Sequence, residues 1–234
     1  MSEKSKNYLF YALGEIVLVM LGILLALQVN NWNEGRIEGR VERKLLLELM
    51  QDLRATLGEL NSDIAMNEML IKEGNQFIEI MNSEREEFLS DTLDVYFLWG
   101  FSAVFARSVA FDNISTRGIS IIKDDSIRLH LAKVYDEEMP RIKNNEEYVD
   151  YHIRHIEEQV SPFIHFRGDG RRNTSTYNFR NGIRVSEFYN LFTYWTTVHR
   201  SRNRVQFLLL DLRSELISLF NRIADYLGYP ERIE

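Results

Sequence analysis

An apolar run near the start of the chain constrains the fold more than any other feature. Residues 8–30 read YLFYALGEIVLVMLGILLALQVN and carry one charged side chain, Glu15. At about 1.5 Å per residue, a helix of this length reaches across the ~30 Å hydrocarbon core of a bilayer. A cleaved signal peptide is the alternative, but its apolar part covers only about 7–15 residues and ends at a small-residue cleavage site. This run is longer and lacks such a site, so it predicts a retained transmembrane helix.

The residues around this run bear on its place in the membrane. Trp32, in the sequence NNWNEGR, is suited to the membrane–water interface as an aromatic anchor. Basic residues flank the run on both sides, and their count weakly favours a cytoplasmic C-terminal part. Long domains cross membranes largely regardless of charge, so this count does not decide the side. We expect a single pass, with the lipid bilayer as a partner.

Composition narrows the class of the remaining chain. The formal net charge of -7 argues against nucleic-acid binding. With 3 Pro and 12 Gly in 234 residues, disorder and a turn-rich β fold are both disfavoured. The chain has no cysteine, which excludes disulfides and thiolate metal sites.

Helix-forming residues dominate after the apolar run, so we expect an all-α fold. The transmembrane helix continues into a helical stalk and then into a helical-bundle domain. The expected parts are an N-terminal tail at 1–7, the transmembrane helix at 8–31, the stalk at 32–82 and the bundle at 83–234. The bundle includes an arginine-rich loop at 165–184, where Gly, Asn, Thr and Ser cluster.

A heptad pattern marks the predicted stalk. Apolar residues alternate at spacings of four and three, and one asparagine occupies a position of the same series: Leu46, Met50, Leu53, Leu57, Leu60, Ile64, Asn67 and Ile71. The pattern fits an amphipathic helix packed in its own domain. It also fits an intermolecular coiled coil, in which the asparagine would fix the register.

Helix-capping and helix-breaking residues divide the predicted bundle into separate helices. Gly118 is a helix stop, and Asp124 with its two successors is suited to cap the next helix. Pro140 lies where a further helix is expected to begin, and Pro162 closes it. Residues 185–227 form one long helix, or two joined near 201–204.

One face of the predicted transmembrane helix is small and polar. Steps of 3.6 residues from Glu15 reach Gly22, Ala26 and Asn33. The Gly22–Ala26 pair lets helices approach closely, and an ionisable group inside a membrane needs a partner, water or a proton. This face predicts association of several copies, with or without a pore lined by Glu15. Alternatively, Glu15 reaches the nearby interface or pairs with a lysine of the tail.

Two further clusters are candidate binding residues. Five arginines of the 165–184 loop suit an anionic ligand: Arg167, Arg171, Arg172, Arg180 and Arg184. Alternatively, the loop is simply solvated, or its arginines form ion pairs with the acidic body of the domain. His152, His155 and Glu158 share one face of a predicted helix. Their order does not match H-E-x-x-H, so packing or surface histidines are favoured over a metal site.

Residues Tyr11–Glu34 read YALGEIVLVMLGILLALQVNNWNE. This segment resembles the N-terminal signature YAxGEIxLVxxGILxALQxNNWNE of a family of single-pass membrane proteins of unknown function from Bacteroidota. Residues 111–135 are similar to the family in pattern only. The resemblance implies an inner-membrane protein with its N-terminus inside and its soluble domain in the periplasm. It implies no activity.

Two functions are therefore expected. The first is a homo-oligomeric membrane protein whose anchors associate through the Glu15 face, as a pore or a membrane scaffold gated by its soluble domain. The alternative is a monomeric or dimeric membrane-tethered sensor or binding module for an anionic ligand or a protein partner. The chain has no G-x-S-x-G, P-loop, G-x-G-x-x-G or kinase motif. We therefore expect neither an enzyme nor a cofactor.

Overall fold

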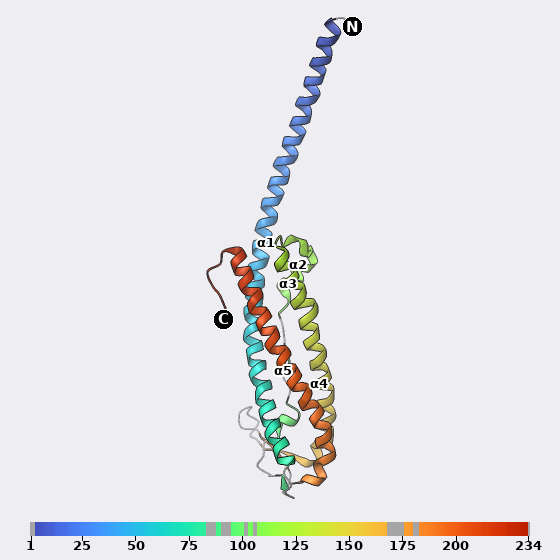
Figure 1. Cartoon of the computed structure of the whole chain (residues 1–234), viewed down its shortest axis with the longest axis vertical. Coiled ribbons are helices and arrows are strands. Elements are labelled where there is room, and N and C mark those ends of the chain that lie inside the picture. Colours follow the sequence, from blue (N-terminus) through green and yellow to red (C-terminus); the bar gives the residue numbers. More distant parts are fainter. Residues whose placement is uncertain are drawn as a thin grey trace.

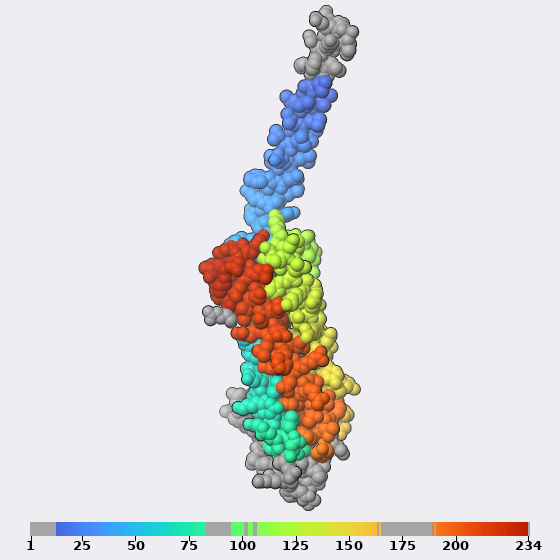
Figure 2. Space-filling view, viewed as in Figure 1, coloured from blue at the N-terminus to red at the C-terminus, as the bar shows by residue number. Residues whose placement is uncertain are grey.

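The computed structural model describes residues 3–82, 88–89, 95–100, 103–104, 107–167, 176–179 and 183–233. Its first element, α1 (Glu3–Met81), is one unbroken helix. The side chains of residues 13–40 are exposed or half-exposed, and close packing begins at Glu42. Figures 1 and 2 show this N-terminal part standing clear of an elongated bundle. One helix therefore forms both the protruding segment and a wall of the bundle.

Two further long helical runs complete the bundle. The first consists of α3 (Asp125–Ala132), η3 (Lys133–Glu138) and α4 (Met139–Val160), which follow one another without a break. The second is α5 (Val185–Leu227), a single helix rather than two. α5 packs against both α1 and α4 and runs back toward the protruding end (Figure 1).

Short elements lie at the two ends of the bundle. α2 (Val109–Arg117) and η2 (Ile119–Ile121) lie near the protruding helix (Figure 1), and η1 (Tyr96–Leu98) contacts both α1 and α4. At the other end, η4 (Ser161–Phe163) leads into β2 (Ile164–Arg167), which pairs antiparallel with β3 (Thr176–Phe179). β1 (Phe88–Leu89) pairs antiparallel with β4 (Ile183–Arg184). Helices dominate, so the predicted all-α class is confirmed.

The heptad face of α1 packs within its own chain. Leu46, Leu53 and Leu60 are fully buried, and α5 covers this part of the helix. Asn67 is also buried, and its amide donates to the carbonyl oxygen of Arg202 at 3.2 Å and to Gln206 at 2.8 Å. The amphipathic-helix interpretation is therefore confirmed. An intermolecular coiled coil through this face is wrong, because the face is already buried in the monomer.

α4 and α5 contribute the other two sides of the core. The spacing of apolar residues in both helices predicts one stripe on each, and every member whose side chain the structure describes is buried: Ile142, Val149, Ile153, Ile156 and Val160 on α4, and Phe192, Trp195, Val205, Leu208, Leu212, Leu216, Leu219 and Ile223 on α5. Burying apolar area at this scale is the main driving force that holds the three long helical runs together.

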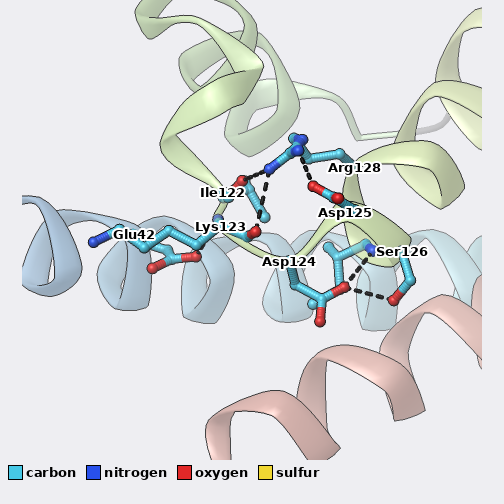
Figure 3. A network of polar contacts seen from close by, with 8 residues as sticks. Glu42, Ile122, Lys123, Asp124, Asp125, Ser126 and Arg128 are labelled. Carbon is cyan, nitrogen blue, oxygen red and sulfur yellow. Dashed lines mark hydrogen bonds and ion pairs between the residues drawn. The ribbon is translucent and has the colours of Figure 1, made fainter.

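The predicted helix boundaries near the protruding end are confirmed. Gly118 ends α2 with φ 92°, a conformation that residues with a side chain rarely adopt. The carboxylate of Asp124 accepts the backbone N–H of Ile127 at 2.9 Å and so caps α3 (Figure 3). Glu42 of α1 accepts the N–H of Lys123 at 2.7 Å, which ties this connection to the first helix.

The helix around Pro140 differs from the expectation of a separate new helix. α4 begins at Met139, but the chain arrives through the wide turn η3, in which the N–H of Met139 bonds to the carbonyl of Val134. Proline has no N–H and its ring clashes with the preceding turn of an α-helix. A π-type turn accommodates that proline without a break, since its hydrogen bonds reach one residue further back.

Candidate functional site

The chain crosses from the far end of the bundle back to α2 through a segment that begins with the short helix η1. We call residues 95–108 the return segment, of which 95–100, 103–104 and 107–108 are described. The backbone N–H of Val104 donates to Glu146 on α4 at 3.1 Å, and that of Arg107 donates to Thr56 on α1 at 3.1 Å. The segment therefore lies between these two helices, whose polar side chains accept its backbone N–H groups.

Arg202 on α5 also forms hydrogen bonds with the backbone of the return segment. Its guanidinium donates to the carbonyl oxygens of Phe97 and Gly100, and the side chain is almost fully buried. Burial lowers the pKa of Arg202 to about 10. Such buried polar residues in a helical core are explained by the backbone groups that they satisfy.

A groove of about 770 Å³ opens beside the return segment. Val104, Phe111, Met139 and Ile142 form most of its apolar lining, together with Tyr135. These residues come from the return segment, α2, η3 and α4. The volume lies within the range of about 300–1,000 Å³ that is typical of small-molecule sites.

Acidic side chains dominate the polar part of the groove. Asp112 comes from α2, while Glu146, Glu147 and Asp150 come from α4. Lys143 is the one basic residue among the described lining residues. Two of these acids have cationic neighbours, since Glu147 lies 4.0 Å from Lys143 and Asp150 bonds to Arg154.

Tyr135 is the buried polar group of this groove. Its ring stacks on Phe111 with centroids 4.1 Å apart and planes 5° from parallel. Its hydroxyl is buried and has no hydrogen-bond partner among the described residues. Such an orphaned group costs about 1–3 kcal/mol. Burial, together with the charges of Asp52 and Asp112, raises the pKa of the tyrosine.

The wide turn η3 carries Tyr135 to this place. Its extra backbone width, which accommodates Pro140, shifts the residues of η3 relative to an ordinary α-helix. Tyr135, Met139 and Pro140 all line the groove. Turns of this kind occur often at functional sites, and this one contributes the unpartnered hydroxyl.

Glu146 lies between the groove and the core. Its side chain is 6% exposed, and burial raises its pKa to about 7, against the lowering effect of the Val104 N–H. The negative charge of Asp63 raises the pKa further. Glu146 also lines a second, much smaller interior space with Asn67 and Arg202. The carboxyl group therefore connects the groove to the polar centre of the bundle.

The predicted anchor face lies on the protruding part of α1. Glu15, Gly22, Ala26 and Asn33 are all exposed along this single helix. A side chain added at Gly22 would meet no atom within 4 Å, and Asn33 accepts a bond from Arg36 at 3.5 Å. The fold leaves this face open.

The predicted arginine cluster is only partly within the described residues. Arg167 lies in β2 and Arg184 in β4, and their backbones alone are described. Arg171, Arg172 and Arg180 lie outside the described residues. Anion binding by these five residues stays a prediction.

The histidine pair on α4 belongs to an aromatic cluster. His152 bonds to the hydroxyl of Tyr194, and the ring of His155 lies 5.0 Å from the same tyrosine. No group of three His, Asp or Glu residues within the described part of the chain is arranged to hold a metal ion. The packing interpretation of His152 is the one that the contacts support.

The groove residues were missed by the sequence reasoning. Glu146 gives one usable signal, because it falls between Ile142 and Val149 in the buried stripe of α4. A charged residue at a core position needs a buried partner, which the N–H of Val104 supplies. Tyr135 gives no such signal, since its position depends on the wide turn.

Comparison with known proteins gives a family and no activity. Residues 15–198 match the model of a family described as "Family of unknown function (DUF6090)". Neither a curated protein nor a solved structure matches the chain. The matched region includes most of the apolar segment and every groove-lining residue except Leu212. Because the match covers well over half of its 234 residues, the chain belongs to the DUF6090 family.

Proposed function

We propose that this protein is a membrane-anchored binding module, held by α1 and binding a ligand in the groove. The groove carries the proposal, because it combines apolar walls, the buried carboxyl group of Glu146 and a buried hydroxyl with no partner among the described residues. That combination is typical of small-molecule sites, in which a few polar groups orient a ligand against apolar walls.

The anchor follows from the protruding part of α1. This is the one described helix that is long and apolar enough to cross a membrane, and none of its apolar window is buried in the bundle. Large apolar side chains such as Leu18 and Leu25 are more than half exposed. A lipid environment would cover them. With the family resemblance, this supports a single pass through the inner membrane and a bundle on the periplasmic side.

α1 also provides a mechanical link between groove and membrane. Thr56 and Asp52 of α1 accept N–H groups of Arg107 and Ala110, which flank the groove. A ligand that moves these residues would act directly on the helix that enters the membrane. The module would therefore report occupancy of the groove along α1, as a tethered sensor does.

The test uses the full chain in lipid nanodiscs, with methionine methyl groups labelled for NMR. Met139 lines the groove, and Met66 lies elsewhere on α1 with 38% of its surface exposed. A chemically mixed set of small fragments should include some that shift the Met139 signal saturably and leave Met66 unchanged. If no fragment moves Met139 selectively, the groove is not a binding site and the proposal fails.

A second candidate function is homo-oligomeric assembly through the anchor, as a pore or a scaffold. The open face at Glu15, Gly22 and Ala26 favours it, because small residues allow close helix contact in lipid. The mass of the nanodisc particle tests it. A defined oligomer that changes in Glu15→Leu would support assembly, whereas a monomer in both proteins would rule it out.

A further inference from the structure

We propose that the groove binds an organic cation, an ammonium or guanidinium group carried on a small aromatic or apolar body. This inference rests on the proposed binding function and adds the chemical class of the ligand. The same walls would accept an apolar body of any charge, so the polar groups decide which charge the groove prefers.

The charge balance of the groove favours a cation. The lining holds four carboxylates and one ammonium group. Lys143 compensates Glu147, and Arg154 compensates Asp150. This leaves Asp112 and Glu146, neither of which has a cationic partner within 4.0 Å among the described residues. A bound cation would supply the missing positive charge.

The hydroxyl of Tyr135 supplies a second, independent observation. It is buried without a partner among the described residues, and burial, with the charges of Asp52 and Asp112, raises the pKa of the tyrosine. An ammonium group has three donors, which can be shared between a hydroxyl oxygen and carboxylates. A ligand N–H that reached this oxygen would end its isolation, and the carboxylate of Asp112, which also accepts the hydroxyl of Ser108 at 2.9 Å, would attract the same cation.

The walls suit the body of such a ligand. Phe111 and Tyr135 form a stacked aromatic pair, and Met139 and Ile142 line the groove nearby. Aromatic faces attract cations, and methionine adapts to ligands of different shape. An amine on a short aromatic or alkyl chain meets both requirements.

Glu146 makes the binding dependent on pH. Burial raises its pKa to about 7, so the carboxyl is largely protonated at pH 6 and ionised at pH 8. A cation binds the ionised form, and its affinity should rise about tenfold over this interval. The other charged groups packed around Glu146 are these: Asp63 on α1, Asp112 on α2, Lys143, Glu147 and Asp150 on α4, and Arg202 on α5.

The experiment titrates three probes of similar shape against the full chain in nanodiscs of zwitterionic lipid. The probes are phenethylammonium, the neutral 2-phenylethanol and the anionic 3-phenylpropionate. The Met139 methyl signal reports binding in the groove, and Met66 reports effects elsewhere. We expect saturable binding of the ammonium at least tenfold tighter than that of the alcohol, and none of the anion.

Variants identify the groups responsible. Glu146→Gln keeps an oxygen for the N–H of Val104 but removes the charge, so ammonium binding should weaken at least tenfold and lose its pH dependence. Tyr135→Phe should weaken binding by a smaller factor. Glu157→Gln changes an exposed acid of the same helix and should have no effect. If Glu146→Gln does not fold, the pH dependence of the unaltered protein decides.

The outcomes separate the two proposals. If the alcohol or the anion shifts Met139 as well as the ammonium does, the groove binds ligands but the cation inference is overturned. Equal ammonium affinity in Glu146→Gln and the unaltered protein overturns it too. If no probe shifts Met139 in this or in the fragment experiment, the binding function itself fails.

Discussion

Two buried titratable residues make opposite contributions to stability. Burial raises the pKa of Glu146 to about 7, so its neutral form stabilises the fold at low pH, and this contribution is lost as pH rises from about 4.5 through 7. Burial and the charge of Arg202 lower the pKa of His199 to about 4. Its contribution is present above about pH 6.5 and is lost as pH falls toward 4.

Substituting each residue separately should reveal its contribution to the pH dependence of the unfolding free energy. Relative to the unaltered protein, Glu146→Gln should gain about 2 kcal/mol of unfolding free energy between pH 4.5 and 7.5. His199→Gln should lose about as much over the same interval. Urea unfolding followed by the fluorescence of buried Trp195 measures both. Parallel pH profiles for all three proteins would contradict the assigned pKa shifts.

Two glycines of α1 differ only in their surroundings, and this permits a matched test. A Cβ at Gly74 would lie 2.5 Å from Nδ1 of the buried His199, whereas a Cβ at Gly58 would meet nothing within 4 Å. Gly58→Ala should therefore stabilise the bundle by about 0.5–1 kcal/mol through helix propensity. Gly74→Ala should destabilise it by about 1–3 kcal/mol, because a packed ring must move. Urea unfolding measures both, and equal effects would refute the close contact at Gly74.

At the scale of elements, the buried faces and the ends of the helices were predictable from the sequence, whereas contacts between residues distant in sequence were not. The stripes of α1, α4 and α5 follow from spacing alone, since burial selects every third or fourth residue of a helix. The cap at Asp124 and the stop at Gly118 also follow, because each depends on one residue and its immediate neighbours.

The parts of the candidate site that escaped prediction depend on contacts distant in sequence. Nothing near Val104 indicates that Glu146, 42 residues later, will accept its N–H. The wide turn at Tyr135 results from a compromise between Pro140 and the continuity of a long helix, which local propensity does not resolve. The anchor face was predictable as a pattern, but its use depends on other molecules.

At the scale of the whole molecule, α1 has two parts: an exposed apolar segment and a segment that packs into the bundle. Ten residues, 32–41, separate the predicted membrane segment from the first closely packed residue, Glu42. If the apolar segment spans a bilayer as proposed, this spacer would hold the bundle roughly 15 Å from the bilayer core, at about 1.5 Å per residue. In that arrangement the bundle would stand end-on to the membrane, because the spacer is helical, and α2 and the end of α5 lie at the end of the bundle from which α1 protrudes (Figure 1).

This division predicts that the anchor can be removed without unfolding the bundle. Deletion of residues 1–31 removes no buried side chain among those described, so the urea midpoint should be nearly unchanged. The truncated protein should appear in the supernatant of carbonate-washed membranes, while the full chain stays in the pellet.

Deletion of residues 1–46 serves as the contrast, because it also removes Glu42, Leu45 and Leu46 from the core. Loss of two buried leucines should cost at least 4 kcal/mol, at about 2–5 kcal/mol each. If the shorter deletion already unfolds the bundle, the protruding helix is part of its fold. If the shorter deletion stays with the membrane, the attachment resides in the bundle.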